Sequence, residues 1–210
     1  MADVDESRFD ELAGQLIEAG RFFFSRGWVP ATSGNFSARL DDGRIVLTVS
    51  GRHKGRLERD DLMLADLDGR SLSPGRRPSA ETGLHTLLYR RNPQLGAVLH
   101  THSARATVLS MRRPQGVWLR DYEVLKAFPG IETHTSQVHL PVFANDQDIG
   151  RLAAEVERHL DREPASPGYL IAGHGLYTWG ETVSDALRHV EALEFLFECE
   201  LLQTRFDSHE

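Results

Sequence analysis

The sequence contains a single cysteine, Cys199, in 210 residues. An intramolecular disulfide is therefore impossible, and a cysteine-rich zinc site is excluded. No stretch approaches the roughly 18 consecutive apolar residues that a transmembrane helix needs. The N-terminal segment MADVDESRFDEL is acidic and lacks the apolar core of a secretory signal. From these absences we expect a cytoplasmic protein with no membrane partner.

Positive charge is also scarce, since 24 Lys and Arg residues stand against 31 Asp and Glu, and no long basic run occurs. Nucleic-acid binding needs clustered Lys and Arg for the phosphates, so we expect no nucleic-acid partner. Neither a Walker motif nor G-x-G-x-x-G is present, so nucleotide binding has no support. Hydrophobic residues make up 40% of the chain without a break in composition, which predicts one globular domain over residues 1–210.

Helices and strands are expected to be interspersed along the chain. Apolar spacing predicts helices over residues 8–25, 81–91, 103–111, 148–162 and 182–206, with Ser103 and Ser184 as N-caps of two of them. FSARL and RIVLTVS flank Asp41-Asp42-Gly43 and predict a hairpin. GAVLH and YLIAGHG predict buried strands, and the Gly, Pro and Ser content of residues 69–80 predicts a loop.

Two histidines one residue apart, His100 and His102, end the apolar run AVL. Residues i and i+2 of an extended chain point to the same side, so both rings can aim at one point. Two convergent imidazoles begin a zinc site, which needs three or four ligands. The tripeptide alone also fits two surface histidines in a strand-to-helix loop, and it does not decide between these interpretations.

A third histidine, His174, stands where another apolar run ends, between two glycines. A lone His-Gly is usually only a turn. Together with the H-x-H pair at another strand end, His174 becomes the expected third ligand. Three histidines with an open coordination position are typical of a catalytic zinc site.

Two glutamates, Glu81 and Glu123, can be either structural or catalytic. Glu81 opens a predicted helix, where an acidic side chain favours the helix dipole. Glu123 lies among apolar residues and can be an exposed residue paired with Lys126. Taken alone, each is more often structural than catalytic.

Three short stretches combine glycine or proline with hydroxyl or amide side chains: ATSGNFS (31–37), TVSGRHKG (48–55) and PSAE (78–81). Each offers backbone N–H groups in a loop, which suits a phosphate. Ordinary turns use the same residues, so only the three stretches together indicate a phosphate site.

In this order, the stretches resemble the class II aldolase family of zinc-dependent sugar-phosphate enzymes. The family pattern T-x-G-N-x-S, [ST]-G, P-S-x-E, H-x-H and G-H-G is matched at residues 32–37, 50–51, 78–81, 100–102 and 173–175. The resemblance implies an α/β fold, a three-layer α/β/α domain with a central, largely antiparallel sheet, and a fourfold-symmetric homotetramer. It implies one zinc ion per chain on the three histidines, and a phosphate site formed by Ser33, Gly34, Asn35, Ser50, Gly51 and Ser79.

Within the family, DYEVLKAFPG, LPVFANDQDI and residues 169–201 look most like dehydratases of methionine salvage, which act on a methylthio-substituted ketose 1-phosphate. The implied reaction is loss of water across C3 and C4 of the sugar. By position, Glu123 matches the acid/base glutamate of these dehydratases. Glu81 matches the base and resting zinc ligand of the aldolases, and some dehydratases lack it, so Glu81 does not separate the two chemistries.

Two other functions compete with dehydration. An aldolase or 4-epimerase acting on another ketose phosphate would use the same scaffold. A non-catalytic interaction module is a more distant alternative, since a domain without catalysis has no reason to keep all three histidines and both carboxylates. The apolar residues of the last predicted helix are too closely spaced for one face, which indicates a homo-oligomer: Leu193, Phe195, Leu196 and Phe197.

Overall fold

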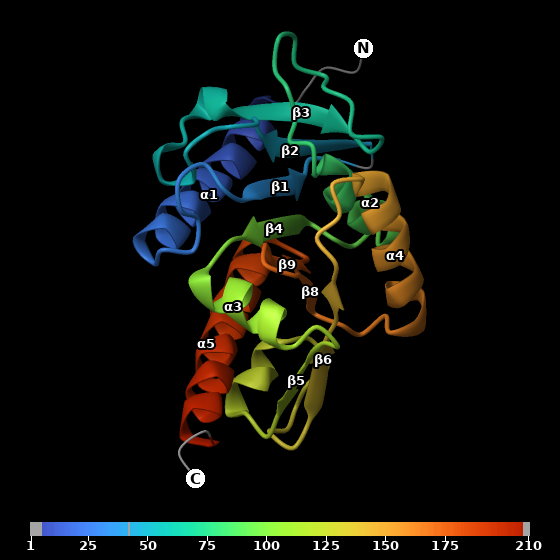
Figure 1. Ribbon diagram of the computed structural model, residues 1–210. Coiled ribbons are helices and arrows are strands. Elements are labelled where there is room, and N and C mark those ends of the chain that lie inside the picture. Colours follow the sequence, from blue (N-terminus) through green and yellow to red (C-terminus); the bar gives the residue numbers. More distant parts are fainter. Residues whose placement is uncertain (1–5, 42, 208–210) are drawn as a thin grey trace.

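The computed structural model describes residues 6–41 and 43–207. Residues 1–5 lie outside the described residues, and so does Asp42, which belongs to the expected hairpin turn. A seven-stranded sheet in the order β3-β2-β1-β4-β9-β8-β7 forms the centre of the molecule (Figure 1). Its neighbouring strands are antiparallel except β7 and β8, which are parallel. The expectation of a largely antiparallel sheet is confirmed.

The strands of this sheet are short. They are β1 Asn35–Arg39, β2 Arg44–Thr48, β3 Leu62–Asp66, β4 Ala97–Thr101, β7 Val142–Phe143, β8 Gly168–Ile171 and β9 Gly175–Gly180. A separate antiparallel hairpin consists of β5 Val117–Arg120 and β6 Gln137–Leu140, and it lies below the large sheet in Figure 1. Sequence periodicity did not identify β3, β5 or β6.

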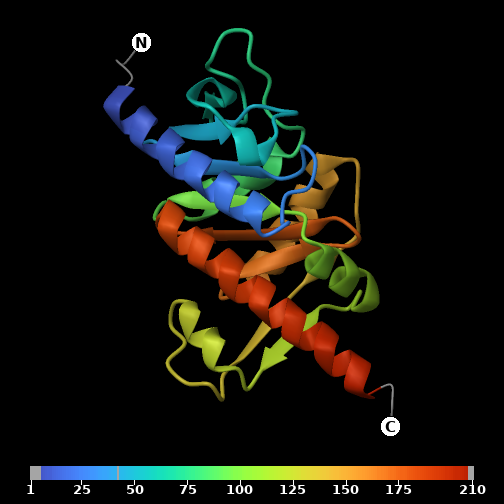
Figure 2. The same ribbon diagram turned by 90° about the vertical axis from the view of Figure 1, so that its left-hand side faces the viewer.

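Helices cover both faces of the large sheet (Figures 1 and 2). α1 Glu6–Ser25 and α5 Val183–Asp207 pack on one face, and α2 Thr82–Arg91 and α4 Ile149–Arg162 pack on the other. Successive side chains of β4 point to opposite faces of the sheet and so contribute to an apolar core on each face. Ala97 and Leu99 face α1 and α5, whereas Val98 faces α2 and α4. The three-layer α/β/α arrangement is therefore confirmed.

A third apolar cluster joins the hairpin to the rest of the molecule. This cluster consists of apolar side chains from α3 Ala104–Arg112, α5, β5, β6 and the 3₁₀ helix Glu123–Ala127. Two other short 3₁₀ helices, Lys54–Arg56 and Arg59–Asp61, lie between β2 and β3. Among the described helices, none combines the length and the apolar character needed to cross a membrane.

The predicted helices are confirmed, with ends that agree within two residues. The Ser103 cap is also confirmed, since its hydroxyl accepts a hydrogen bond from the Ala106 N–H at 2.9 Å. The Ser184 cap is wrong: the Thr182 hydroxyl accepts the bond from the Asp185 N–H at 3.1 Å. The single strand over residues 169–175 is also wrong, because β8 ends at Ile171 and a turn precedes β9.

Candidate metal and phosphate site

Three strand ends meet near the middle of the large sheet. β4 runs antiparallel to both β1 and β9, and its His100 is paired with Asn35 on one side and Tyr177 on the other. The turn before β9 carries His174 and therefore lies beside the end of β4. A Cβ at Gly175 would lie only 2.0 Å from the Thr101 carbonyl oxygen, so glycine permits this close approach.

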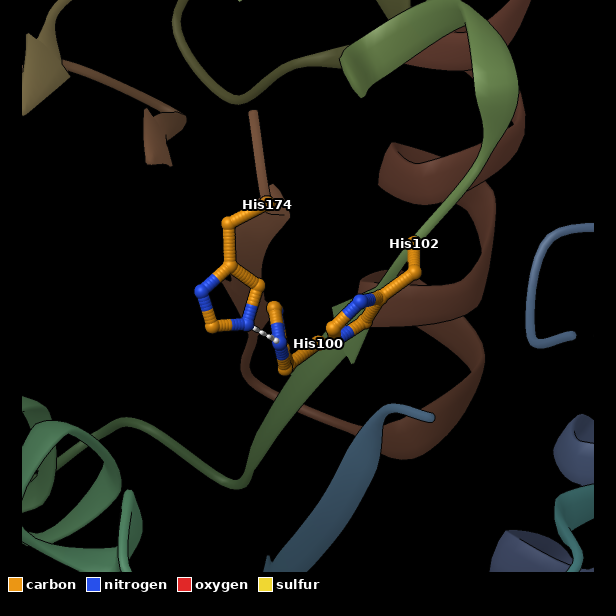
Figure 3. Close-up of side chains that lie close together, drawn as sticks. All are labelled: His100, His102 and His174. Carbon is orange, nitrogen blue, oxygen red and sulfur yellow. Dashed lines mark hydrogen bonds between the residues drawn. The ribbon is translucent and has the colours of Figure 1, made fainter. Parts of the chain in front are cut away.

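His100, His102 and His174 point toward one another at this position (Figure 3). Their ligand nitrogens lie within 4.8 Å of one another, and Nε2 of His100 is 3.2 Å from Nε2 of His174. Nδ1 of His100 is hydrogen-bonded to the Leu176 carbonyl oxygen at 2.8 Å, which leaves Nε2 as its ligand atom.

The protonation state of the cluster suits metal binding. Burial lowers the pKa of His100 well below its usual range, and burial and the nearby His174 lower the pKa of His102 to about 4. Both imidazoles are therefore neutral, as metal ligands must be. Three converging neutral nitrogens fit a divalent metal ion.

Glu81 immediately precedes α2 and contacts the histidines. Its Oε1 lies 3.0 Å from Nε2 of His174, and its Oε2 lies 3.6 Å from Nε2 of His100. The amide of Asn35 and the hydroxyl of Tyr177 donate to Oε2 at 2.7 and 3.1 Å. Burial alone would raise the pKa of Glu81, but its hydrogen bonds with His174 and Asn35 hold the pKa below its usual range. Glu81 is an ionised carboxylate in position to bind a metal or accept a proton.

A buried chain of hydrogen bonds extends from Glu81 through Asn35 to the side chains beneath it. His85 bonds to the Ser37 hydroxyl at 2.7 Å through Nδ1 and to the Asn35 side-chain oxygen through Nε2, and Ser37 bonds to the Tyr89 hydroxyl at 2.9 Å. Burial lowers the pKa of His85 to about 4, so its ring is neutral. Sequence analysis missed His85 and Tyr89, although their four-residue spacing after Glu81 puts all three on one helix face.

A cavity of about 300 Å³ opens beside the cluster and brings the three polar-glycine stretches together. Glu81 and His102 line it, so it is continuous with the histidine site. All six residues expected to bind phosphate also line it: Ser33, Gly34, Asn35, Ser50, Gly51 and Ser79. The side chain of Asn35 is already engaged by Glu81 and His85.

Lys54 adds a positive charge that sequence analysis missed. It lines the cavity although it is only 2% exposed. Its Nζ donates to the carbonyl oxygens of Thr32 at 2.9 Å and Arg52 at 2.6 Å, so it ties two of the polar loops together. These bonds use two of the three N–H donors of an ammonium group. Burial lowers the pKa of Lys54 to about 8, against the opposing influence of Glu81 and Asp61.

Glu123 lies apart from this assembly. It begins the 3₁₀ helix Glu123–Ala127, which packs on α5 and lies away from the end of β4 in Figure 1. Its side chain is 70% exposed and pairs with Nζ of Lys126 at 2.6 Å. The hydrogen bond from Lys126 lowers the pKa of Glu123. Within one chain, the structure therefore brings together every predicted site residue except Glu123.

Comparison with known proteins agrees with this geometry. Residues 14–201 match the family described as Class II Aldolase and Adducin N-terminal domain. The chain belongs to this family. Class II aldolases generally use a divalent metal ion, and the histidines with Glu81 offer donors that fit one.

Individual relatives are similar over nearly the whole chain. The methylthioribulose-1-phosphate dehydratase of Pseudomonas paraeruginosa (strain DSM 24068 / PA7) is 62% identical over 193 residues, which cover 91% of this chain and 94% of the relative. The enzyme of the same name from Methylococcus capsulatus (strain ATCC 33009 / NCIMB 11132 / Bath) is 61% identical, with coverage of 94% and 96%. The crystal structure of YgbL from Escherichia coli superposes with a TM-score of 0.78 at 27% identity and covers 92% of this chain and 90% of its own.

Proposed function

We propose that the protein is a zinc-dependent methylthioribulose-1-phosphate dehydratase acting in methionine salvage. The reaction converts 5-methylthioribulose 1-phosphate to 2,3-diketo-5-methylthiopentyl 1-phosphate and water. The observation that carries the proposal is the histidine cluster with Glu81, which opens directly onto the cavity lined by the polar loops. The relatives of that name, 61–62% identical over more than nine tenths of the chain, support dehydration rather than another reaction of the family.

The cavity is proposed to hold the phosphate group of the substrate. Its polar loops offer hydroxyl groups and backbone N–H groups, and Lys54 offers an ammonium. Anchoring the non-reacting phosphate places the carbonyl and hydroxyl groups of the sugar next to the histidines, which lowers the entropic part of the barrier. The same loops account for a requirement for a phosphorylated substrate.

His100, His102 and His174 are proposed to hold the metal, and zinc suits this donor set because magnesium and calcium prefer oxygen ligands. When bound, a divalent metal supplies a Lewis acid that stabilises the negative charge developing on the substrate. Glu81 is ionised and adjacent, so we assign it the removal of the C3 proton. The hydroxyl at C4 then needs a proton to leave as water.

We assign that proton to Glu123, which must act in an environment different from the one it has in a single chain. Exposed and paired with Lys126, the carboxyl has a lowered pKa and is a poor acid. Burial against a neighbouring molecule would raise its pKa and suit it to protonate the leaving group. In the proposed homotetramer, Glu123 therefore serves the cavity of an adjacent copy of the chain.

Exposed apolar side chains support a homo-oligomer. Leu193, Leu196 and Phe197 of α5 are buried in the chain's own core, whereas Phe195 is 50% exposed. Val108 and Met111 of the neighbouring helix α3 are exposed as well. Light scattering is expected to give a tetramer, and a monomer at working concentrations would contradict this part of the proposal. We further propose that the enzyme works in the cytoplasm.

Product analysis tests the reaction itself. Purified enzyme and methylthioribulose 1-phosphate are expected to give the diketone, lighter than the substrate by one water, with no aldehyde fragment. Dihydroxyacetone phosphate and an aldehyde as main products would replace the dehydratase with an aldolase, because they report cleavage of C3–C4. Recovery of only the C4 epimer of the substrate would instead identify an epimerase.

A further inference from the structure

A second group of side chains that can bind a metal shares no residue with the site above and lies where α4 ends near the hairpin β5–β6. It consists of His139 from β6, His159 from the last turn of α4 and Glu163, which ends that helix. One ligand atom from each residue lies within 4.8 Å of the others. Nothing in the proposed dehydration uses these residues.

The distances resemble those of a coordination sphere. Glu163 Oε2 lies 2.9 Å from Nδ1 of His139 and 3.5 Å from Nε2 of His159. Ligand atoms bound at about 2.1 Å to a tetrahedral zinc ion lie about 3.4 Å from one another. Small movements of the half-exposed Glu163 side chain would centre an ion between the three atoms.

The ring of His139 is held in one orientation by its surroundings. The indole of Trp118 stacks on it with centroids 4.6 Å apart. On another side, its Nε2 occupies space that a side chain at position 116 would need, since a Cβ on Gly116 would lie 2.2 Å away. The backbone at Gly116 thus makes room for the ring, and Nδ1 faces Glu163.

His159 brings an observation that ordinary packing does not explain. Its Nε2 is buried and has no hydrogen-bond partner among the described residues, although it faces Glu163. Phe143 packs edge-on against the ring. A buried ring nitrogen that has no hydrogen-bond partner and lies 3.5 Å from a carboxylate oxygen is free to bind a metal ion.

We propose that His139 Nδ1, His159 Nε2 and a Glu163 oxygen form a second, structural site for a zinc-class divalent cation, which fastens the hairpin β5–β6 to the end of α4. Two imidazoles and one carboxylate favour zinc over magnesium or calcium. A cavity of about 1240 Å³ that reaches both His139 and Glu163 admits a water molecule as fourth ligand. A two-stranded hairpin is marginal by itself, so a cross-link to a helix adds to its stability.

Zinc counting on tag-free protein tests this site without any substrate. The chelator-stripped protein is dialysed against micromolar ZnCl₂, and bound zinc is measured per chain. We expect about two zinc ions in the wild type, one in His102→Ala/His174→Ala, and none when His159→Gln is added to that double variant. In the double variant, zinc is expected to raise Tm by at least about 3 °C.

Two further variants guard against misfolding and non-specific binding. Glu163→Gln changes a half-exposed side chain, keeps its shape and is expected to remove the second ion while circular dichroism stays native. His134→Gln replaces an exposed histidine outside both groups and is expected to leave both ions in place. A His102→Ala/His174→Ala protein that binds no zinc would overturn the proposal. So would a second ion that survives both His159→Gln and Glu163→Gln.

Discussion

A single chain assembles the histidine cluster together with the groups around it, but it leaves the segment that carries Glu123 exposed at the surface. Around the histidines, antiparallel pairing fixes three strand ends side by side, and Glu81 is held by Asn35 and Tyr177. Glu123 stands on a short 3₁₀ helix, exposed to solvent and bound to Lys126. The large sheet therefore brings together the residues of the proposed metal and phosphate sites, whereas the proposed acid remains at the surface.

This difference separates two requirements of the reaction. The proposed binding and proton removal need groups held in a preorganised site, and the sheet holds the histidines and Glu81 in place. Protonation of the leaving hydroxyl needs a carboxyl with a raised pKa, and the exposed Glu123 does not have one in the single chain.

The largest effect is expected from the histidines. His174→Ala removes one of the three proposed metal ligands, so bound metal and turnover should both be lost, with kcat/KM at least about 10³-fold lower because Lewis-acid stabilisation is worth several kcal/mol. Elemental analysis and product formation are the measurements, with His134→Ala as the matched control. Full metal content together with full turnover would remove His174 from the site.

Glu123→Gln is expected to lower turnover by at least about 10²-fold while the metal stays bound, since the amide keeps the shape and loses the proton. Mixed and reassembled with His174→Ala, it should regain up to about a quarter of wild-type activity if sites in a symmetric oligomer combine residues of two copies. No recovery on mixing would mean that Glu123 serves its own chain.

Lys54→Met tests the phosphate half of the site. Loss of a charged donor should raise KM about tenfold or more and change kcat less, because the ammonium is proposed to contact the phosphate, which does not react. Steady-state kinetics separate the two constants. An unchanged KM would show that Lys54 only holds the loops of Thr32 and Arg52 together.

A smaller effect is expected from pH. The pKa of Lys54 is lowered to about 8, so its charge is present below that pH and is lost as the pH rises through it. In the wild type, kcat/KM should fall above pH 8, since this constant reports the free enzyme. Lys54→Met should lack this descending limb, and a variant that keeps it would assign the limb to another group.

The sequence predicted most of the regular structure because its signals are local. Helix ends follow caps and apolar spacing, as Ser103 illustrates. β3 was missed because LMLAD shows no clear alternation. The hairpin strands VWLR and QVHL do alternate in burial, but four residues are too few for a reliable pattern. β9 was missed because only a turn separates it from β8 within one apolar run.

In the site as well, local motifs could be predicted from the sequence, whereas contacts that depend on the fold could not. Motifs at strand ends predicted the histidines, and the polar loop stretches predicted the phosphate residues and Glu81. The involvement of Tyr177 depends on its register with His100, and that of Lys54 depends on burial, neither of which spacing reveals. Glu123 was identified by resemblance alone, and its exposure could be seen only in the structure.

We propose a division of roles in which Glu81 and the histidine site remove the C3 proton, whereas Glu123 is required to expel the C4 hydroxyl. One measurement tests it directly: wild type and Glu123→Gln are incubated with methylthioribulose 1-phosphate in deuterated water, and substrate and products are followed by NMR. The wild type should form the diketone, and Glu123→Gln should place deuterium at C3 of recovered substrate without losing water. A Glu123→Gln enzyme that dehydrates at the wild-type rate would contradict the claim.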